Sequence, residues 1–157
     1  MWTNFWRASS QTVVDSGWME QTVIIIDDDN DDTEIFCEAL SEVRGDIVCL
    51  PMSNGKTAVD FFDSSSERNL MAIFLDVNMP VMNGWEILAK LKAIPLISTV
   101  PVIMYSNSSN PSDIQRSKKM GAAYFFIKSF NYHHLKKGLS TVIAHIEKGT
   151  LNEIESP

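Results

Sequence analysis

Two apolar runs in this 157-residue chain each end in carboxylates. Residues 23–26 are followed at once by Asp27 and Asp28, and residues 71–75 by Asp76. Buried strands seldom end in a charge unless that charge is solvated, paired or in use. If the two runs are neighbouring parallel strands, the three carboxylates meet at one edge of the sheet. Such a cluster repels itself, so we expect it to bind a cation.

Two later strand-like runs end in different polar groups. The run 102–105 ends at Ser106, and the run 125–127 ends at Lys128. A hydroxyl and an ammonium can hold an anion, whereas Mg²⁺ takes one or two carboxylates, several waters and phosphate oxygens. A metal together with a phosphoryl group would therefore complete the set. We expect Asp76 to lie nearest the hydroxyl and the ammonium, which makes it the candidate nucleophile.

From residue 22 onward, strand-like and helix-like segments alternate. Strands are predicted at 22–26, 47–50, 71–75, 100–105 and 124–127. Helices are predicted from a cap at Asn30 to Gly45, from Asn54 to a serine-rich loop at 64–66, at 85–92, from Asn110 to Gly121, and at 135–146. This alternation implies right-handed crossovers and an α/β, doubly wound, five-stranded parallel sheet with helices on both faces, of the flavodoxin-like kind. In the strand order 2-1-3-4-5, strands one and three flank the switch point where ligands bind.

Composition narrows the function classes. A net charge of −7 argues against nucleic acid or an anionic membrane surface as a partner. The longest aliphatic runs are too short to span a bilayer, and the N-terminus lacks the pattern of a secretory signal. Cys37 and Cys49 are expected to pack as small apolar residues in a reducing compartment, rather than to form a bridge or a metal site. A cytoplasmic location is predicted.

Taken together, these residues resemble the receiver domain of two-component response regulators, over roughly residues 22–148. The resemblance includes the loop with Met79-Pro80 and Asn83-Gly84 after Asp76. It also includes the separations of 30 residues from Asp76 to Ser106 and of 22 from Ser106 to Lys128. One such motif is weak, but five in order, each at a strand end, are highly specific. Residues 1–21 are then either an N-terminal extension of uncertain order or upstream sequence read through from an early start, since Met19 falls just before the first strand. Residues 149–157 are a C-terminal tail of a single-domain regulator.

The resemblance implies a phosphoacceptor site. Asp76 would accept a phosphoryl group from a sensor histidine kinase, a phosphotransfer protein or a small donor such as acetyl phosphate. Mg²⁺ would be held by Asp28, Asp76 and the backbone carbonyl of Asn78, with Asp27 acting mostly through water. The protein would act as a signalling phosphoacceptor rather than as an enzyme on other substrates.

The resemblance also implies a switch. Lys128 and Ser106 would bind phosphoryl oxygens, and Phe125 would swing inward as Ser106 moves toward the phosphate. A downstream protein, not identified by the sequence, would read the surface formed by the fourth helix, fifth strand and fifth helix. Members of the family often form homodimers through the same surface, so the resemblance also implies a possible homodimer.

Two positions depart from the usual family pattern. Ser129 stands where a proline, often after a cis bond, usually follows the lysine. Because a cis bond before a non-proline residue costs about 2.5–4 kcal/mol, the Lys128–Ser129 bond is predicted to be trans. Phe125 stands where tyrosine is frequent, so the switch residue would pack without offering a hydroxyl.

Other interpretations remain open at this stage. The chain could be a phosphorelay intermediate, a scaffold that never takes phosphate, or a phosphatase-like enzyme with an aspartyl-phosphate intermediate. The last usually needs a second acid two residues after the nucleophile, where this chain has Asn78. Surface positions are predicted for His133 and His134. The acids around the start of the first helix are read as partners of the helix dipole, namely Asp29, Asp31, Asp32 and Glu34.

Overall fold

A five-stranded parallel sheet forms the centre of the molecule in the computed structural model, which describes residues 20–64 and 69–155. The strand order is β2-β1-β3-β4-β5, as predicted. The strands are β1 (Gln21–Ile26), β2 (Ile47–Met52), β3 (Leu70–Asp76), β4 (Val102–Ser106) and β5 (Tyr124–Ile127).

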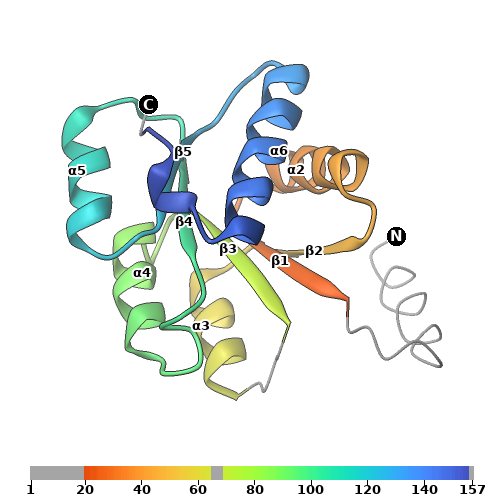
Figure 1. The fold of residues 1–157 in the computed structure, drawn as a ribbon. Helices are drawn as coiled ribbons and strands as arrows, with labels where there is room; N and C mark the ends of the chain where they lie inside the picture. The colour runs from red at the N-terminus through yellow and green to blue at the C-terminus, as the bar shows by residue number, and fades with distance from the viewer. Residues whose placement is uncertain (1–19, 65–68, 156–157) are drawn as a thin grey trace.

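Helices cover both faces of this sheet (Figure 1). One face carries α2 (Asn30–Val43) and α6 (Tyr132–Lys148), and the other carries α3 (Gly55–Ser64), α4 (Gly84–Ala93) and α5 (Pro111–Lys119). A short 3₁₀ helix, η2 (Leu151–Glu153), follows α6, and its Leu151 is buried beside that helix. The predicted α/β doubly wound architecture is confirmed.

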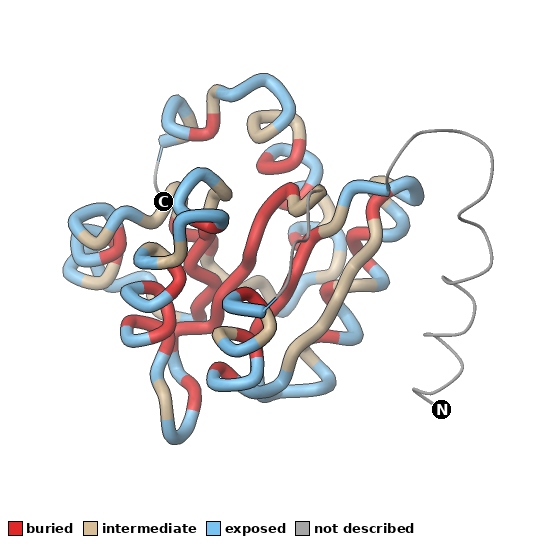
Figure 2. The backbone as a smooth tube through the Cα atoms, turned by 90° about the horizontal axis from the view of Figure 1, so that it is seen from below, coloured by how far each residue is buried: buried red, intermediate tan, exposed pale blue. Residues whose placement is uncertain are grey.

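The core consists of two apolar clusters, one on each face of the sheet. Successive strand residues point to opposite faces, so Ile25 and Phe74 pack under α2 and α6, whereas Ile24 and Ile73 pack under the other three helices. The paired strands place Ile24 beside Ile73 and Ile25 beside Phe74. Figure 2 shows the buried central strands and the exposed outer turns of the helices. Because both faces are covered, the central strands are nearly continuous apolar runs whose polar residues stand only at their ends.

Side-chain caps set where most of the helices begin. Asparagines cap three of them: Asn83 caps α4 in a reciprocal capping box, Asn110 caps α5 and Asn131 caps α6. The predicted cap of α2 at Asn30 is wrong by one residue. Asp29 has the extended backbone of a cap, and its carboxylate accepts hydrogen bonds from two backbone N–H groups of the first turn.

Cys37 and Cys49 are joined by a disulfide, which corrects the expectation that they pack unpaired. Cys37 lies on α2 and Cys49 on the edge strand β2, with their Cα atoms 5.4 Å apart. The helix, the tight turn at its end and the returning strand bring the two positions together. This proximity depends on how the helix docks on the strand, so the sequence spacing alone did not indicate it.

Within the described part of the chain, no helix has both the length and the apolar character needed to cross a bilayer.

Candidate functional site

The carboxyl ends of β1 and β3 bring three carboxylates together. Ile26 pairs with Leu75 across the two strands, so the residues that follow, Asp27 and Asp76, are neighbours. Asp27, Asp28 and Asp76 each offer an oxygen within 4.8 Å of the others. Two of the three side chains are buried and Asp28 is exposed, so the cluster opens to solvent on one side. The structure therefore brings together the three acids that the sequence singled out.

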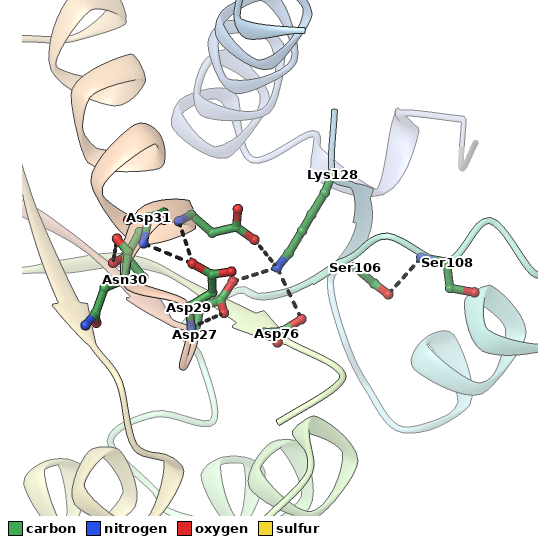
Figure 3. A network of polar contacts seen from close by, with 10 residues as sticks. Asp27, Asp29, Asn30, Asp31, Asp76, Ser106, Ser108 and Lys128 are labelled. Carbon is green, nitrogen blue, oxygen red and sulfur yellow. Dashed lines mark hydrogen bonds and ion pairs between the residues drawn. The ribbon is translucent and has the colours of Figure 1, made fainter. Parts of the chain in front are cut away.

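Lys128, at the end of β5, reaches into this cluster and makes three ionic contacts (Figure 3). Its Nζ lies 2.6 Å from Asp27, 2.9 Å from Asp32 and 3.5 Å from Asp76. The expectation that Asp76 is the acid nearest the ammonium is wrong, because Asp27 and Asp32 both lie closer. The ammonium thus bridges the start of α2 to the centre of the sheet.

Asp32 is the site residue that sequence analysis missed. It was read as a partner of the helix dipole, yet its carboxylate accepts a hydrogen bond from Lys128. The available signal was its place in the first turn of a helix that begins only four residues after β1 ends. A helix starting so close to the strand end directs its first turn toward the same edge of the sheet.

Burial dominates the electrostatics of the acids. Asp76 is only 5% exposed, and burial, followed by repulsion from the Asp27 carboxylate, raises the pKa of Asp76 to about 6. The charge of Lys128 and the backbone N–H of Asn78 oppose that rise only in part. Burial also raises the pKa of Asp27 despite its hydrogen bond from Lys128. An added cation would relieve this excess of negative charge.

The pKa of Lys128 shifts in the direction that keeps it charged. Burial by itself lowers the pKa of this ammonium, but hydrogen bonds to Asp27 and Asp32 outweigh the burial, and the net shift is upward. The ammonium also lies 4.9 Å from the centre of the Tyr105 ring. Lys128 is therefore a permanent positive charge beside Asp76.

The loop after Asp76 is held tightly against the end of β3. The Gly84 N–H donates to the Val77 carbonyl over 2.9 Å, and a Cβ added at Gly84 would lie 2.2 Å from the Asp76 carbonyl oxygen. Only glycine fits this approach. Within the same loop, Val81 has a φ of 69° and a fully exposed side chain. This left-handed conformation is rare for a β-branched residue and is a local strain in the loop that follows Asp76.

Ser106 and Phe125 lie on the neighbouring strands. Ser106 is fully buried; its Oγ accepts a hydrogen bond from the Ser108 N–H over 3.0 Å, and its carbonyl accepts one from the Lys128 N–H over 2.7 Å. Phe125 pairs with Met104 and is 1% exposed in the core cluster on the α3, α4 and α5 face. The roles predicted for Ser106 and Phe125 remain predictions.

Two expectations about the end of β5 are confirmed. No peptide bond in residues 20–64 and 69–155 is cis, so Lys128–Ser129 is trans. His133 and His134, in the first turn of α6, are both exposed. Neither histidine therefore belongs to the acid cluster.

The donor set of the acid cluster fits a hard divalent cation. Three carboxylates from two strand ends supply oxygen ligands, and the exposed side of the cluster leaves room for water. Neither cysteine lies in the cluster, and both are committed to the disulfide. The chemistry is that of Mg²⁺ or Mn²⁺ rather than of a soft metal.

A five-stranded parallel sheet with an acid cluster and a lysine at its carboxyl edge defines the class of receiver domains. The family model described as the response regulator receiver domain matches residues 23–140. The chain belongs to this family of two-component signalling proteins.

Similar proteins include known response regulators. Response regulator Rcp1 of Synechocystis sp. is 26% identical over 143 residues, covering 87% of this chain and 93% of Rcp1. Two-component response regulator ORR11 of Oryza sativa is 27% identical over 136 residues, covering 87% of this chain and 90% of that protein.

Solved structures share the fold. The phosphorylated cyanobacterial phytochrome response regulator RcpA has a TM-score of 0.73 at 23% identity, covering 83% of this chain and 96% of RcpA. The Mn²⁺-bound form of Rcp1 has a TM-score of 0.68 at 24% identity, covering 87% of this chain and 99% of that one.

Proposed function

We propose that this receiver accepts a phosphoryl group on Asp76, in a Mg²⁺-dependent transfer from a sensor histidine kinase or a phosphotransfer protein. The observation that carries the proposal is the placement of Asp76, which ends the central strand β3 between an acid cluster and the buried ammonium of Lys128. Together they suit a carboxylate that receives an anionic group.

The transfer is a displacement at phosphorus. A carboxylate oxygen of Asp76 forms the new P–O bond while the P–N bond of the donor phosphohistidine breaks, and the donor imidazole keeps the electron pair. Catalysis then consists mainly of positioning and charge neutralisation. Lys128 supplies fixed positive charge. Ser106 accepts a hydrogen bond from the Ser108 N–H at its Oγ, so its own O–H is left to donate to a phosphoryl oxygen.

The acid cluster supplies the ligands for the metal in this proposal. Asp28, Asp76 and the backbone carbonyl of Asn78 would hold Mg²⁺ directly, and Asp27, already bonded to Lys128, would act mostly through water. Bound Mg²⁺ would neutralise charge on the transferring phosphoryl oxygens. The similar Rcp1 has a Mn²⁺-bound form, which supports the choice of a divalent cation in this proposal.

Phosphorylation would change the surface formed by α5, β5 and α6. Lys128 and Ser106 connect Asp76 to β4 and β5, and Phe125 is the buried residue beside them that would respond. A groove of about 370 Å³ lies on this surface, with Tyr124, Phe126 and Lys137 among its lining residues. A downstream protein, or a second copy of this chain, would bind there.

The remaining parts of the proposal follow from the class of protein. We propose a cytoplasmic signalling protein that catalyses only its own phosphorylation and dephosphorylation, with residues 22–148 as the receiver unit. Asn78 stands where a phosphatase of similar mechanism needs a second acid, which disfavours an enzyme acting on other substrates. Nucleic acid and membrane partners are not proposed.

Intact-mass measurement after incubation with acetyl phosphate and Mg²⁺ tests the proposal. The expected result is an increment of one phosphoryl group that is absent in Asp76→Asn and when the metal is chelated. Asp60→Asn, an exposed acid on α3, is the matched control and should keep the increment. No increment from acetyl phosphate or from any phosphohistidine donor would favour a scaffold. Rapid turnover of a generic phosphate ester would favour a phosphatase, and passage of the group to a second phosphotransfer protein would identify a relay.

A further inference from the structure

We propose that Cys37 and Cys49 form a reversible redox-modification site that clamps α2 to the edge strand β2. The disulfide joins a helix to a strand across a separation of 12 residues. Both cysteines are only half-buried, although they pack against the apolar cluster on the α2 and α6 face. A bridge that solvent can approach is open to attack by a dissolved thiol.

The surroundings of the bridge explain why the fold can accommodate both states. Phe36, Ala39 and Leu40 bury the adjoining face of α2 in the core, each with no exposed surface. Arg44, at the end of the helix, is held by ion pairs to Asp46 and Glu147. The helix therefore keeps its packing and its C-terminal anchor when the bridge opens, and the reduced protein should remain folded.

The clamp acts on the helix that forms one wall of the acid cluster. Asp29 caps α2, and Asp32 in its first turn holds Lys128. Cys37 follows Asp32 by five residues on the same helix, little more than one turn away. The bridge thus restrains a segment that carries part of the functional site, without contributing an atom to it.

The chemistry is a thiol–disulfide exchange with a small disulfide such as oxidised glutathione. One cysteine thiolate attacks the glutathione disulfide, forming a mixed disulfide and releasing one glutathione thiolate. The second cysteine thiolate then attacks the cysteine sulfur of the mixed disulfide, closing the bridge and releasing the second glutathione. The two cysteines lose two electrons and two protons in total, and the glutathione disulfide gains them.

Titration of the full-length protein in glutathione redox buffers tests this inference. The oxidised protein should be about 2 Da lighter than the reduced one and resistant to alkylation, and millimolar reduced glutathione should restore two alkylatable thiols under native conditions. The loop closed by the bridge predicts a melting temperature roughly 5–10 °C higher for the oxidised form. The melting temperature of Cys37→Ser combined with Cys49→Ser should not respond to redox buffer.

Three results would overturn the inference. Two free thiols in excess oxidised glutathione, or a stable glutathione adduct on one cysteine, would mean that the pair does not close. A bridge that survives reduced glutathione in the native state would be a permanent cross-link. Equal melting temperatures of the oxidised and reduced proteins would show that the bridge does not clamp α2 to β2. Because the site lies outside the phosphoacceptor residues, Asp76→Asn should titrate as the wild type does, so failure here is separate from failure of the proposed function.

Discussion

Replacing Asp76 by asparagine should stabilise the folded protein at neutral pH in metal-free buffer. The folded protein raises the pKa of Asp76 from 3.8 to about 6. At about 1.4 kcal/mol per pKa unit, keeping this carboxylate ionised costs the folded state about 3 kcal/mol above pH 6. The Asp76 side chain is only 8% exposed, so solvent screening removes little of this cost. Asparagine fills nearly the same space without the charge.

The sign of the pH dependence follows from the raised pKa. Between about pH 4 and pH 6 the folded protein binds the Asp76 proton more tightly than the unfolded chain does, so this residue makes stability fall as pH rises through that window. The penalty is complete above the folded pKa and absent below the unfolded one. The advantage of Asp76→Asn should therefore be largest near pH 7.5 and shrink toward zero near pH 4.

Urea unfolding of the two proteins across this pH range, with a chelator present, measures the difference. We expect a gain of about 3 kcal/mol near neutral pH, equivalent to roughly 6–12 °C in melting temperature. Asp60→Asn, at an exposed position of α3, should change stability by less than about 0.5 kcal/mol at every pH. A destabilised Asp76→Asn at neutral pH, or a gain that does not depend on pH, would refute the reasoning.

Further predictions concern the residues around Asp76. Gly84→Ala should cost about 1–3 kcal/mol in urea unfolding because its Cβ would lie 2.2 Å from backbone, whereas Gly45→Ala, with its nearest atom at 3.6 Å, should be tolerated. Equal losses of stability in Gly84→Ala and Gly45→Ala would contradict the close approach of Gly84 to the end of β3. Lys128→Met should cost about 3–5 kcal/mol at neutral pH, since it leaves the buried Asp27 without its cation, and less at low pH where that acid is protonated. A loss independent of pH would argue against charge as the cause. Mg²⁺ at a hundred times its dissociation constant should stabilise the wild type by about 2.7 kcal/mol in thermal unfolding and Asp28→Asn by much less; an equal gain would place the metal elsewhere.

The sequence predicted the fold and most of the candidate site. Short apolar runs, helix caps and turn residues are local signals, so the alternation of strands and helices could be derived from them. Right-handed crossovers then restricted the sheet order, and parallel strands brought Asp27, Asp28, Asp76 and Lys128 to one edge. To predict that these residues meet, it was enough to place each of them at the carboxyl end of a strand, because the carboxyl ends of parallel strands share one edge of the sheet.

Only the tertiary structure decided which of these groups touch. Lys128 contacts Asp27 and Asp32, which lie 101 and 96 residues away in the sequence. Both carboxylates are closer to its ammonium than that of Asp76. The tertiary structure likewise decided the disulfide between Cys37 and Cys49 and the raised pKa of Asp76. Each depends on interatomic distances of a few ångströms and on burial, which result from how the helices dock on the sheet. Sequence patterns specify the face and the end of an element, but distances between side chains arise only when the elements pack.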